Sequence, residues 1–404
     1  MQIQKCKGSR DMLPADMTQF RRVELPFREA CLEGGYAEIR TPTLEYLYLF
    51  TSAGTLTPGM LQRVYSFLDW DGWSGERVVL KPDATIPAAR LYLERLTQEK
   101  PARLFYVTNT FVFDETGVKA RERWQCGAEL IGADSPLGDA DLVALALSAL
   151  NKIGVANLSL KLSHAGLIRA ALAGLGISPE EQRTIFNRIL DFGAKALAEV
   201  ETANLQGLEA MKLLCDTHGE SSGYLKNLRA LASSAAPEYG SALDDFIRSF
   251  ELIEVLGVPC RIDMTAGKGF EYYTGLIFRI YAGEDNIGGG GRYNRLISVL
   301  GGEDTPAAGF ALYMDRLMAC LPDEGEQLPC VTVACPLDEL KMGTALLAAL
   351  RQAGIPARFS LGEPLPKTRM VEVDAAGRFT ATDTSGEKNT CDSILEVTKW
   401  LLRT

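Results

Sequence analysis

Residues 268–275 read KGFEYYTG, and residues 288–293 read GGGGRY. A short apolar stretch, LIFRIY at residues 276–281, lies between them. Glycines allow the backbone to approach a ligand closely, and tyrosines offer a flat wall with a polar tip. Together, the two segments predict the floor of a pocket for a small amino acid.

The hydrophobic periodicity around this stretch predicts an α+β fold. Strands and helices do not alternate as they do in a doubly wound parallel sheet, and neither a GxGxxG nor a P-loop motif is present. We therefore expect an antiparallel sheet flanked by helices. The expected helices are 16–34, 84–97 and 139–152, and the expected strands are 36–42, 76–81, 258–263, 270–282 and 306–313, with an antiparallel pair at 103–113 and 123–132.

Two changes in the pattern divide the chain. From about residue 166 to 256 the pattern is almost wholly helical and rich in Ala and Leu, and we interpret this segment as a helical insertion. A short charged linker at 322–327 then separates a first domain, residues 1–321, from a second, residues 329–404. The second segment combines short strand and helix patterns, so we expect a small α/β domain there.

The composition is that of an ordinary soluble globular protein, with 47% hydrophobic and 23% charged residues. The net charge of −10 argues weakly against tight nucleic-acid binding, which usually requires a basic patch. Nine cysteines without CxxC spacing and only two histidines argue against a zinc site and favour reduced thiols. With no long apolar run and no apolar signal core at the start, we expect a cytoplasmic protein without a membrane partner.

Four segments resemble class II aminoacyl-tRNA synthetases, and within that class the histidyl-tRNA synthetases. The first joins residues 8–14 to residues 36–42, which correspond to motif 1 of the dimer interface. The second is KPDAT at 81–85, and the third is the hairpin at 104–132, in the place of motif 2. The fourth runs from 268 to 317 and ends in motif 3. In this order the segments imply the synthetase fold and a dimer.

Three positions depart from the synthetase pattern. Val112 stands where motif 2 carries an arginine that clamps the ATP α-phosphate, and an isopropyl group cannot replace a bidentate guanidinium. Lys268 stands where the histidyl enzymes carry an arginine that contacts phosphate and amino acid, and Asp83 where they usually carry glutamate. Because the loss of such a clamp costs about 10²-fold or more in rate, these departures imply that the ATP chemistry is absent.

The chain is more similar to a synthetase paralogue, the regulatory subunit of ATP phosphoribosyltransferase. Residues 82–90, 125–136, 139–141 and 163–169 carry this resemblance. It implies a subunit of histidine biosynthesis that is not catalytic, has no cofactor, is required by a short-form catalytic subunit and takes part in feedback inhibition by histidine. It also implies a homodimer within a larger hetero-oligomer. Residues 330–404 hold no excess of basic over acidic residues, which argues against tRNA as a partner.

Two other functions stay open at this point. One is a divergent histidine–tRNA ligase that catalyses ATP-dependent aminoacylation. The other is a scaffold that binds no small molecule.

The resemblance also predicts site residues. Gln125 and Glu129 are four apart on a strand, so they share a face and would hold the imidazole and ammonium of a histidine-like ligand; the alternative is a hydrated polar sheet face. Tyr272 and Tyr273 must point to opposite faces, and Tyr273 is expected to face the ligand. The full histidine-binding set is Asp83, Thr85, Gln125, Glu129, Lys268, Tyr272 and Tyr273, with Arg121 and Arg316 as residual phosphate contacts.

Three further features have alternative interpretations. The glycine run at 288–291 is either a phosphate cradle or a hairpin connection under the sheet. Arg316 is either the motif 3 nucleotide contact or part of a structural ion pair. His164 is expected to cap or pack at the start of the helical insertion, and not to act in catalysis.

Overall fold

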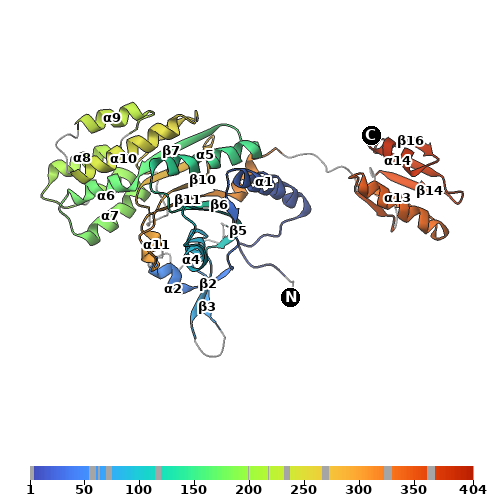
Figure 1. The fold of residues 1–404 in the computed structure, drawn as a ribbon, viewed down its shortest axis with the longest axis horizontal. Helices are drawn as coiled ribbons and strands as arrows, with labels where there is room; N and C mark the ends of the chain where they lie inside the picture. The colour runs from blue at the N-terminus through green and yellow to red at the C-terminus, as the bar shows by residue number, and fades with distance from the viewer. Residues whose placement is uncertain are drawn as a thin grey trace. The chain divides into compact units, whose positions relative to one another are not determined.

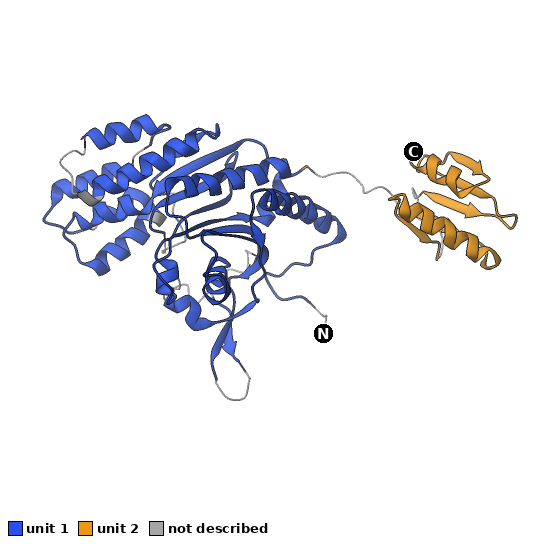
Figure 2. Ribbon diagram, in the orientation of Figure 1, with its two compact units in different colours: residues 1–321 blue, residues 322–404 orange. Residues whose placement is uncertain are grey.

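The computed structural model forms two compact units, residues 1–321 and 322–404 (Figure 2). We describe each unit by itself. The structure describes residues 4–53, 61, 64–69, 75–113, 120–198, 200–216, 218–231, 237–265, 273–322, 330–361 and 369–403.

An eight-stranded sheet forms the centre of the first unit, in the order β1-β5-β6-β11-β10-β9-β7-β8 (Figure 1). Only its two outer pairs, β1 with β5 and β7 with β8, are parallel. The predicted antiparallel sheet flanked by helices is therefore confirmed. Its strands are β1 (Ala37–Glu38), β5 (Ala102–Phe111), β6 (Glu122–Ile131), β7 (Leu158–His164), β8 (Cys260–Ile262), β9 (Leu276–Ala282), β10 (Asp285–Arg292) and β11 (Ala307–Tyr313).

The expected antiparallel pair is the hairpin of β5 and β6, in which ten residues of each strand are in register. The two loop interpretations of the glycine run are wrong, because Gly288–Gly291 lie inside β10 and pair with β9 on one side and β11 on the other. Glycine is a poor strand former by itself. Its use here reflects close packing, because a Cβ atom at any of these positions would come within 2.7 Å of a backbone carbonyl oxygen of a neighbouring strand.

Helices lie on both faces of this sheet. The predicted helices are present as α1 (Pro14–Glu33), α4 (Thr85–Arg95) and α5 (Pro136–Ile153). The start of α4 packs against Tyr106 on the face opposite α1 and α5. Helix α5 begins where the Ser135 hydroxyl accepts a hydrogen bond from the Gly138 N–H, and it ends at Gly154, whose φ of 91° requires a residue without a Cβ. Its buried side chains pack with α1 and with α10 (Pro237–Glu254) over the sheet. The shorter helices of this part are α2 (Leu47–Ser52), α11 (Leu296–Val299) and α12 (Met314–Cys320).

The helical insertion follows β7 and precedes β8 in the sequence (Figure 1). It begins at His164, whose Nδ1 accepts a hydrogen bond from the Leu167 N–H at 3.1 Å, as expected for a capping residue. Strand β7, which leads into it, was not predicted from the sequence. The elements of the insertion are α6 (Ala165–Ala173), α7 (Pro179–Phe192), η1 (Gly193–Leu197), α8 (Leu205–Cys215), α9 (Ser222–Leu231) and α10 (Pro237–Glu254).

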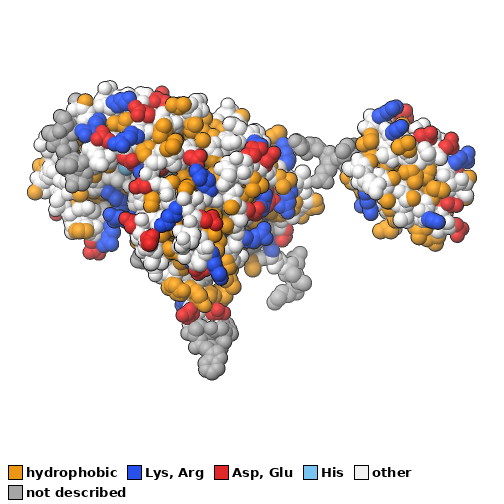
Figure 3. Space-filling model, viewed as in Figure 1, with side chains coloured by type: hydrophobic (Ala, Val, Ile, Leu, Met, Phe, Trp, Pro, Cys, Tyr) orange, Lys and Arg blue, Asp and Glu red, His pale blue; other side chains and the backbone are white. Residues whose placement is uncertain are grey.

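A second, three-stranded sheet in the first unit has the order β2-β4-β3. Its strands are β2 (Leu44–Tyr46), β3 (Ser66–Leu68) and β4 (Arg77–Leu80). Tyr46 and Phe67 flank Val78 in one cross-strand row and are both exposed. Figure 3 shows apolar side chains gathered in the region of this small sheet.

The second unit has its own core and a five-stranded sheet in the order β13-β12-β14-β15-β16. Its apolar centre includes Val333, Leu346 and Phe379, all nearly inaccessible to solvent. The elements are β12 (Val331–Ala334), η2 (Leu337–Glu339), α13 (Leu340–Gln352), β13 (Ala357–Phe359), β14 (Met370–Val373), β15 (Phe379–Thr382), β16 (Lys388–Cys391) and α14 (Ile394–Leu401). In neither unit does the described part of the chain contain a helix that is long and apolar enough to cross a membrane.

Candidate functional site

The candidate site lies on the face of the large sheet opposite α1 and α5. Gln125 and Glu129 both lie on β6, four residues apart, so they share this face as expected. In the register of the sheet Glu129 pairs with Gly309 of β11, and Gly309 pairs with Gly291 of β10. Gln125 pairs with Tyr313 at the other end of β11. The predicted ligand face is thus a continuous surface across three central strands.

Glu129 is the centre of this surface, with a side chain that is almost completely buried. The Tyr106 hydroxyl donates a hydrogen bond to its Oε1 at 2.8 Å, and the Tyr293 hydroxyl donates to its Oε2. Burial raises the pKa of Glu129 to about 8, although hydrogen bonds from Tyr293, Tyr106 and Thr85 oppose the shift. The carboxyl group is therefore close to its own titration point near neutral pH.

Three glycines make room for the polar side chains that lie flat on the sheet. A Cβ atom at Gly127 would overlap the ring of Tyr106, and a Cβ atom at Gly309 would overlap the carboxylate of Glu129. At Gly291 a Cβ atom would lie 3.0 Å from two ring carbons of Tyr273. We call Gly127, Gly291 and Gly309 the glycine floor. It accounts for one glycine in each of β6, β10 and β11.

Asp83 and Thr85 approach this surface from the beginning of α4. The Oδ1 atom of Asp83 accepts a hydrogen bond from the Ile86 N–H at 2.9 Å, which satisfies one free N–H at the start of the helix. Burial raises the pKa of Asp83 to about 6, against the effect of the backbone N–H groups. The Thr85 hydroxyl interacts with both Glu129 and Tyr106. Both predicted residues therefore belong to the same cluster.

The structure describes only one of the two predicted tyrosines. Tyr273 is buried on the face of Glu129, as expected, and burial raises its pKa above the usual value for tyrosine. Its electrostatic neighbours include Arg279, Tyr313 and Glu129. Lys268 and Tyr272 lie outside the described residues.

The residues predicted as phosphate contacts have other partners. The guanidinium of Arg121 lies over the Phe113 ring, 4.7 Å from the centroid. Arg316 donates a hydrogen bond to the backbone carbonyl of Asn286 at 2.9 Å, and its guanidinium lies 6.0 Å from the Tyr313 ring centroid. Val112 is the position that departs from motif 2, and its N–H donates a hydrogen bond to the Arg121 carbonyl at 2.9 Å.

Arg292 does not belong to the ligand face, although the sequence places it in the same motif as Tyr293. Its side chain lies on the helix-covered face, where Nε donates to Asp139 at 3.1 Å and Nη1 donates to Asp245 at 2.9 Å. His164 contacts the same Asp245 oxygen through Nε2 at 3.0 Å. Because Nδ1 of His164 accepts from a backbone N–H, Nε2 carries the proton and donates.

Two residues of the cluster were not predicted as ligand-site residues, Tyr106 and Tyr293. Both hold the carboxyl group of Glu129. Strand alternation offers a signal for Tyr106, which lies directly opposite Gly127 in the β5–β6 register and so shares the face of Gln125 and Glu129. The signal for Tyr293 is its position two residues beyond Gly291, on the same side of the chain.

The chain is similar to two groups of known proteins. The profile of the family described as Histidyl-tRNA synthetase matches residues 8–317. The ATP phosphoribosyltransferase regulatory subunit of Dehalococcoides mccartyi strain BAV1 is 49% identical over 360 residues, which cover 88% of this chain and 87% of the relative. The chain belongs to the family of ATP phosphoribosyltransferase regulatory subunits. The part that matches the synthetase profile, residues 8–317, lies within the first unit.

More distant relatives carry the name of the enzyme. The histidine–tRNA ligase of Methanocaldococcus jannaschii is 33% identical, and the match covers 87% of this chain and 84% of the ligase. Two solved structures share the fold. The crystal structure of an ATP phosphoribosyltransferase regulatory subunit/histidyl-tRNA synthetase from Bacillus halodurans has a TM-score of 0.77 at 23% identity and covers 89% of this chain and 93% of its own. That of histidyl-tRNA synthetase from Nostoc has a TM-score of 0.79 at 19% identity and covers 100% and 99%.

The chemistry available to this site is binding and proton exchange. Its polar groups include the carboxyls of Glu129 and Asp83, three tyrosine hydroxyls and a threonine hydroxyl, which suit a small cationic or amphoteric ligand. Within the described ranges no group of three or more His, Cys, Asp or Glu side chains is arranged to hold a metal ion. The relatives' name, regulatory subunit, supports a role other than catalysis.

Proposed function

We propose that this chain is the non-catalytic regulatory subunit of a cytoplasmic ATP phosphoribosyltransferase, and that it binds histidine as a feedback effector. A short-form catalytic subunit would be its partner, and the mixed complex would catalyse the first step of histidine biosynthesis. The observation that supports the proposal is a buried carboxyl, Glu129, held by the Tyr106 and Tyr293 hydroxyls, together with Val112 in place of a phosphate-clamping arginine. Such a site retains recognition of an amino acid and lacks the grip on ATP.

The partner experiment measures phosphoribosyltransferase activity of a short-form catalytic subunit, alone and with this chain. We expect the catalytic subunit to be inactive alone and active in the mixture, or to be at least about tenfold more active in the mixture. Equal activity with and without the chain would overturn the regulatory role. A matched control replaces this chain with a histidine–tRNA ligase of similar size.

The alternative function is tested by pyrophosphate exchange with histidine and ATP. Because no guanidinium is available at position 112, we expect no exchange above background. Robust turnover would favour the divergent ligase instead. A filter-binding measurement with tRNA completes this test, and we expect only weak, salt-sensitive binding, since the chain carries a net charge of −10.

The effector experiment is calorimetry with free histidine, in the presence of the catalytic partner. Burial raises the pKa of Glu129 to about 8, so an ammonium group bound beside it would favour release of its proton. The number of protons released on binding is measured in two buffers of different ionisation enthalpy. In the Glu129→Gln variant, we expect this number to fall to the number released by the ligand alone. If histidine still inhibits the complex and releases the same protons from this variant, the effector site lies elsewhere while the regulatory role stands.

We also propose that the chain forms a homodimer within the larger complex. The resemblance of residues 36–42 to motif 1 supports this, and so do the exposed apolar side chains of the neighbouring β2 and β3, among them Tyr46 and Phe67. Exposed apolar surface of this kind is typical of association sites. Light scattering should give twice the chain mass, and a monomer at micromolar concentration would contradict the proposal.

A further inference from the structure

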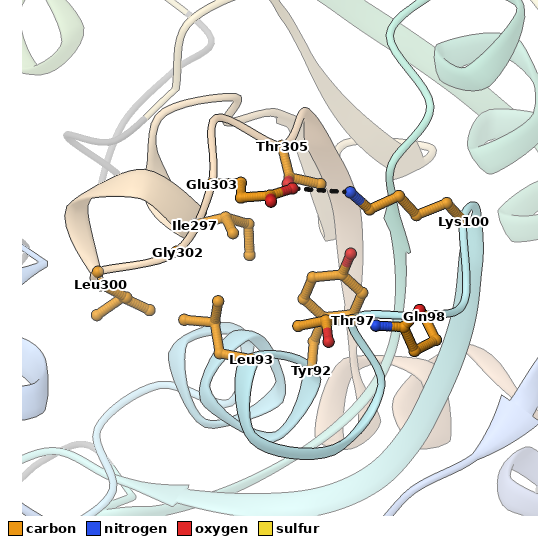
Figure 4. Close-up of a pocket in the computed structure, with 11 residues that line it drawn as sticks. Tyr92, Leu93, Thr97, Gln98, Lys100, Ile297, Leu300, Gly302, Glu303 and Thr305 are labelled. Atoms are coloured by element: carbon orange, nitrogen blue, oxygen red, sulfur yellow. Dashed lines mark hydrogen bonds and ion pairs between the residues drawn. The ribbon is translucent and has the colours of Figure 1, made fainter.

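A separate cavity of about 640 Å³ lies between the end of α4 and the loop that follows α11 (Figure 4). Its volume falls within the ~300–1,000 Å³ of small-molecule sites. Leu93 of α4 lines one side, and Ile297 and Leu300 line the other. This cavity is distinct from the cluster around Glu129, since the two share no lining residue.

One polar atom inside the cavity has no partner. Tyr92 is only 1% exposed, and no hydrogen-bonding group among the described residues pairs with its hydroxyl. Figure 4 shows this hydroxyl directed from α4 toward Lys100 at the wall of the cavity, with its oxygen atom itself buried. Tyr92 lies on the same helix face as Ile86 and Ala89, which are buried, so phenylalanine would serve the packing equally well. A buried hydroxyl without a partner destabilises the fold, and its presence is accounted for if a ligand supplies the missing hydrogen bond.

A pair of opposite charges lies at the edge of the same cavity. Lys100 Nζ is 3.1 Å from Glu303 Oε2, and the two side chains come from opposite walls (Figure 4). Both are well exposed, so the pair contributes little to stability and is easily exchanged for other partners. The ammonium and carboxylate of a free amino acid are attached to one carbon and therefore present opposite charges at a comparable spacing. The ligand ammonium is thus complementary in charge to Glu303, and the ligand carboxylate to the adjacent Lys100.

We propose that this cavity binds a free amino acid, as a second small-molecule site of the chain. The ligand carboxylate pairs with Lys100 and its ammonium with Glu303. Its side chain lies against Leu93 and Ile297 and provides a hydrogen-bonding atom for the Tyr92 hydroxyl. The chemistry excludes ligands with only one of the two head-group charges, because these leave either Lys100 or Glu303 without its partner.

The test is calorimetry on the full-length chain with each of the twenty free amino acids at about 10 mM, a concentration that detects affinities near the millimolar limit. We expect saturable binding of at least one. Its amide and its N-acetyl derivative, which lack the carboxylate and the ammonium charge, should bind about tenfold more weakly or not at all. Binding of none of the twenty, or equal binding of these derivatives, would overturn the proposal.

Two variants with matched controls complete the experiment. Tyr92→Phe should weaken binding about 3- to 10-fold while raising the melting temperature of the free chain, because it removes an unpaired buried hydroxyl. Lys100→Ala should weaken binding by a similar factor. The controls are Tyr224→Phe and Lys212→Ala, both in the helical insertion, and neither should change the affinity. Unchanged affinity in both cavity variants, or loss of the binding of an amino acid other than histidine in Glu129→Gln, would place the ligand elsewhere and overturn the proposal.

Discussion

The carboxylate of Glu129 lies over the backbone of Gly309 on the neighbouring strand, in the space that a side chain at position 309 would occupy. The two residues are a register pair of β6 and β11. Two tyrosine hydroxyls then hold the carboxylate from its two oxygen atoms. Recognition by this site therefore depends on backbone that is free of side chains as much as on the polar groups themselves.

Gly309→Ala should displace Glu129 and break at least one of its hydrogen bonds. Because the carboxyl group is buried, we expect a loss of about 1–3 kcal/mol in the free energy of unfolding, together with loss of histidine binding. Urea denaturation and calorimetry measure the two effects. The control is Gly223→Ala in α9, where the nearest atom to an added Cβ is the Ser221 hydroxyl at 3.6 Å, an ordinary contact. If both variants are as stable as the natural chain, the glycine floor has no role in placing Glu129.

The stability of the chain should fall with rising pH through the titration of Glu129. Its pKa is raised to about 8 in the fold, mainly by burial, from an ordinary value of 4.5. Between these values the folded state holds a proton that the unfolded state has released, so the folded state loses its advantage as the pH rises. The free energy of unfolding, followed by urea denaturation from pH 5 to 8, should decline less in Glu129→Gln than in the natural chain.

Glu209→Gln on the exposed surface of α8 is the matched variant for this measurement, and its pH profile should parallel that of the natural chain. A Glu129→Gln profile that also runs parallel to the natural one would show that the buried carboxyl does not titrate in this range.

Arg292→Met should destabilise the first unit by about 3–5 kcal/mol, because it leaves Asp139 as an uncompensated charge under the sheet. Burial already raises the pKa of Asp139, and Arg292 opposes that shift. Chemical denaturation measures the loss. Arg378→Met, which removes an exposed pair with Asp374 in the second unit, should have no measurable effect. Equal stability of both variants would mean that the buried network contributes no more than a surface pair.

Residues 330–404 should fold without the rest of the chain. They contain a complete core and a sheet of five strands. A fragment of this length should therefore show a cooperative thermal transition by circular dichroism, although small domains are only marginally stable. Phe379→Ala, at a position that is 1% exposed, should remove most of that stability, since such truncations cost about 3–5 kcal/mol. A broad transition without cooperativity in the natural fragment would contradict this expectation.

Local sequence patterns predicted those parts of the fold that depend on short-range order. The apolar alternation of residues 103–113 and 123–132 predicted a hairpin, and His164 was correctly placed at the start of the insertion. Strand β10 was missed because its glycines have little strand propensity, and only the close approach of neighbouring strands in the folded sheet explains them.

The polar networks were harder to predict because their members are far apart in the chain. Asp139 and Asp245 are 153 and 47 residues from Arg292, and no local pattern relates them. Glu129 was predicted as a ligand residue from a resemblance, but its partner Tyr293 lies 164 residues away. Alternation along one strand can indicate which face of the sheet a residue lies on. The prediction that Gln125 and Glu129 share one face was correct.

The glycine floor also sets a rule for how this surface can change during evolution. Gly127 accommodates Tyr106, Gly291 accommodates Tyr273 and Gly309 accommodates Glu129. A larger residue at any of the three positions is tolerated only if the side chain above it shrinks in the same lineage. Relatives that have abandoned the amino-acid ligand should therefore have lost these pairs together, as correlated substitutions, while the hydrogen-bonding register of the sheet stays the same.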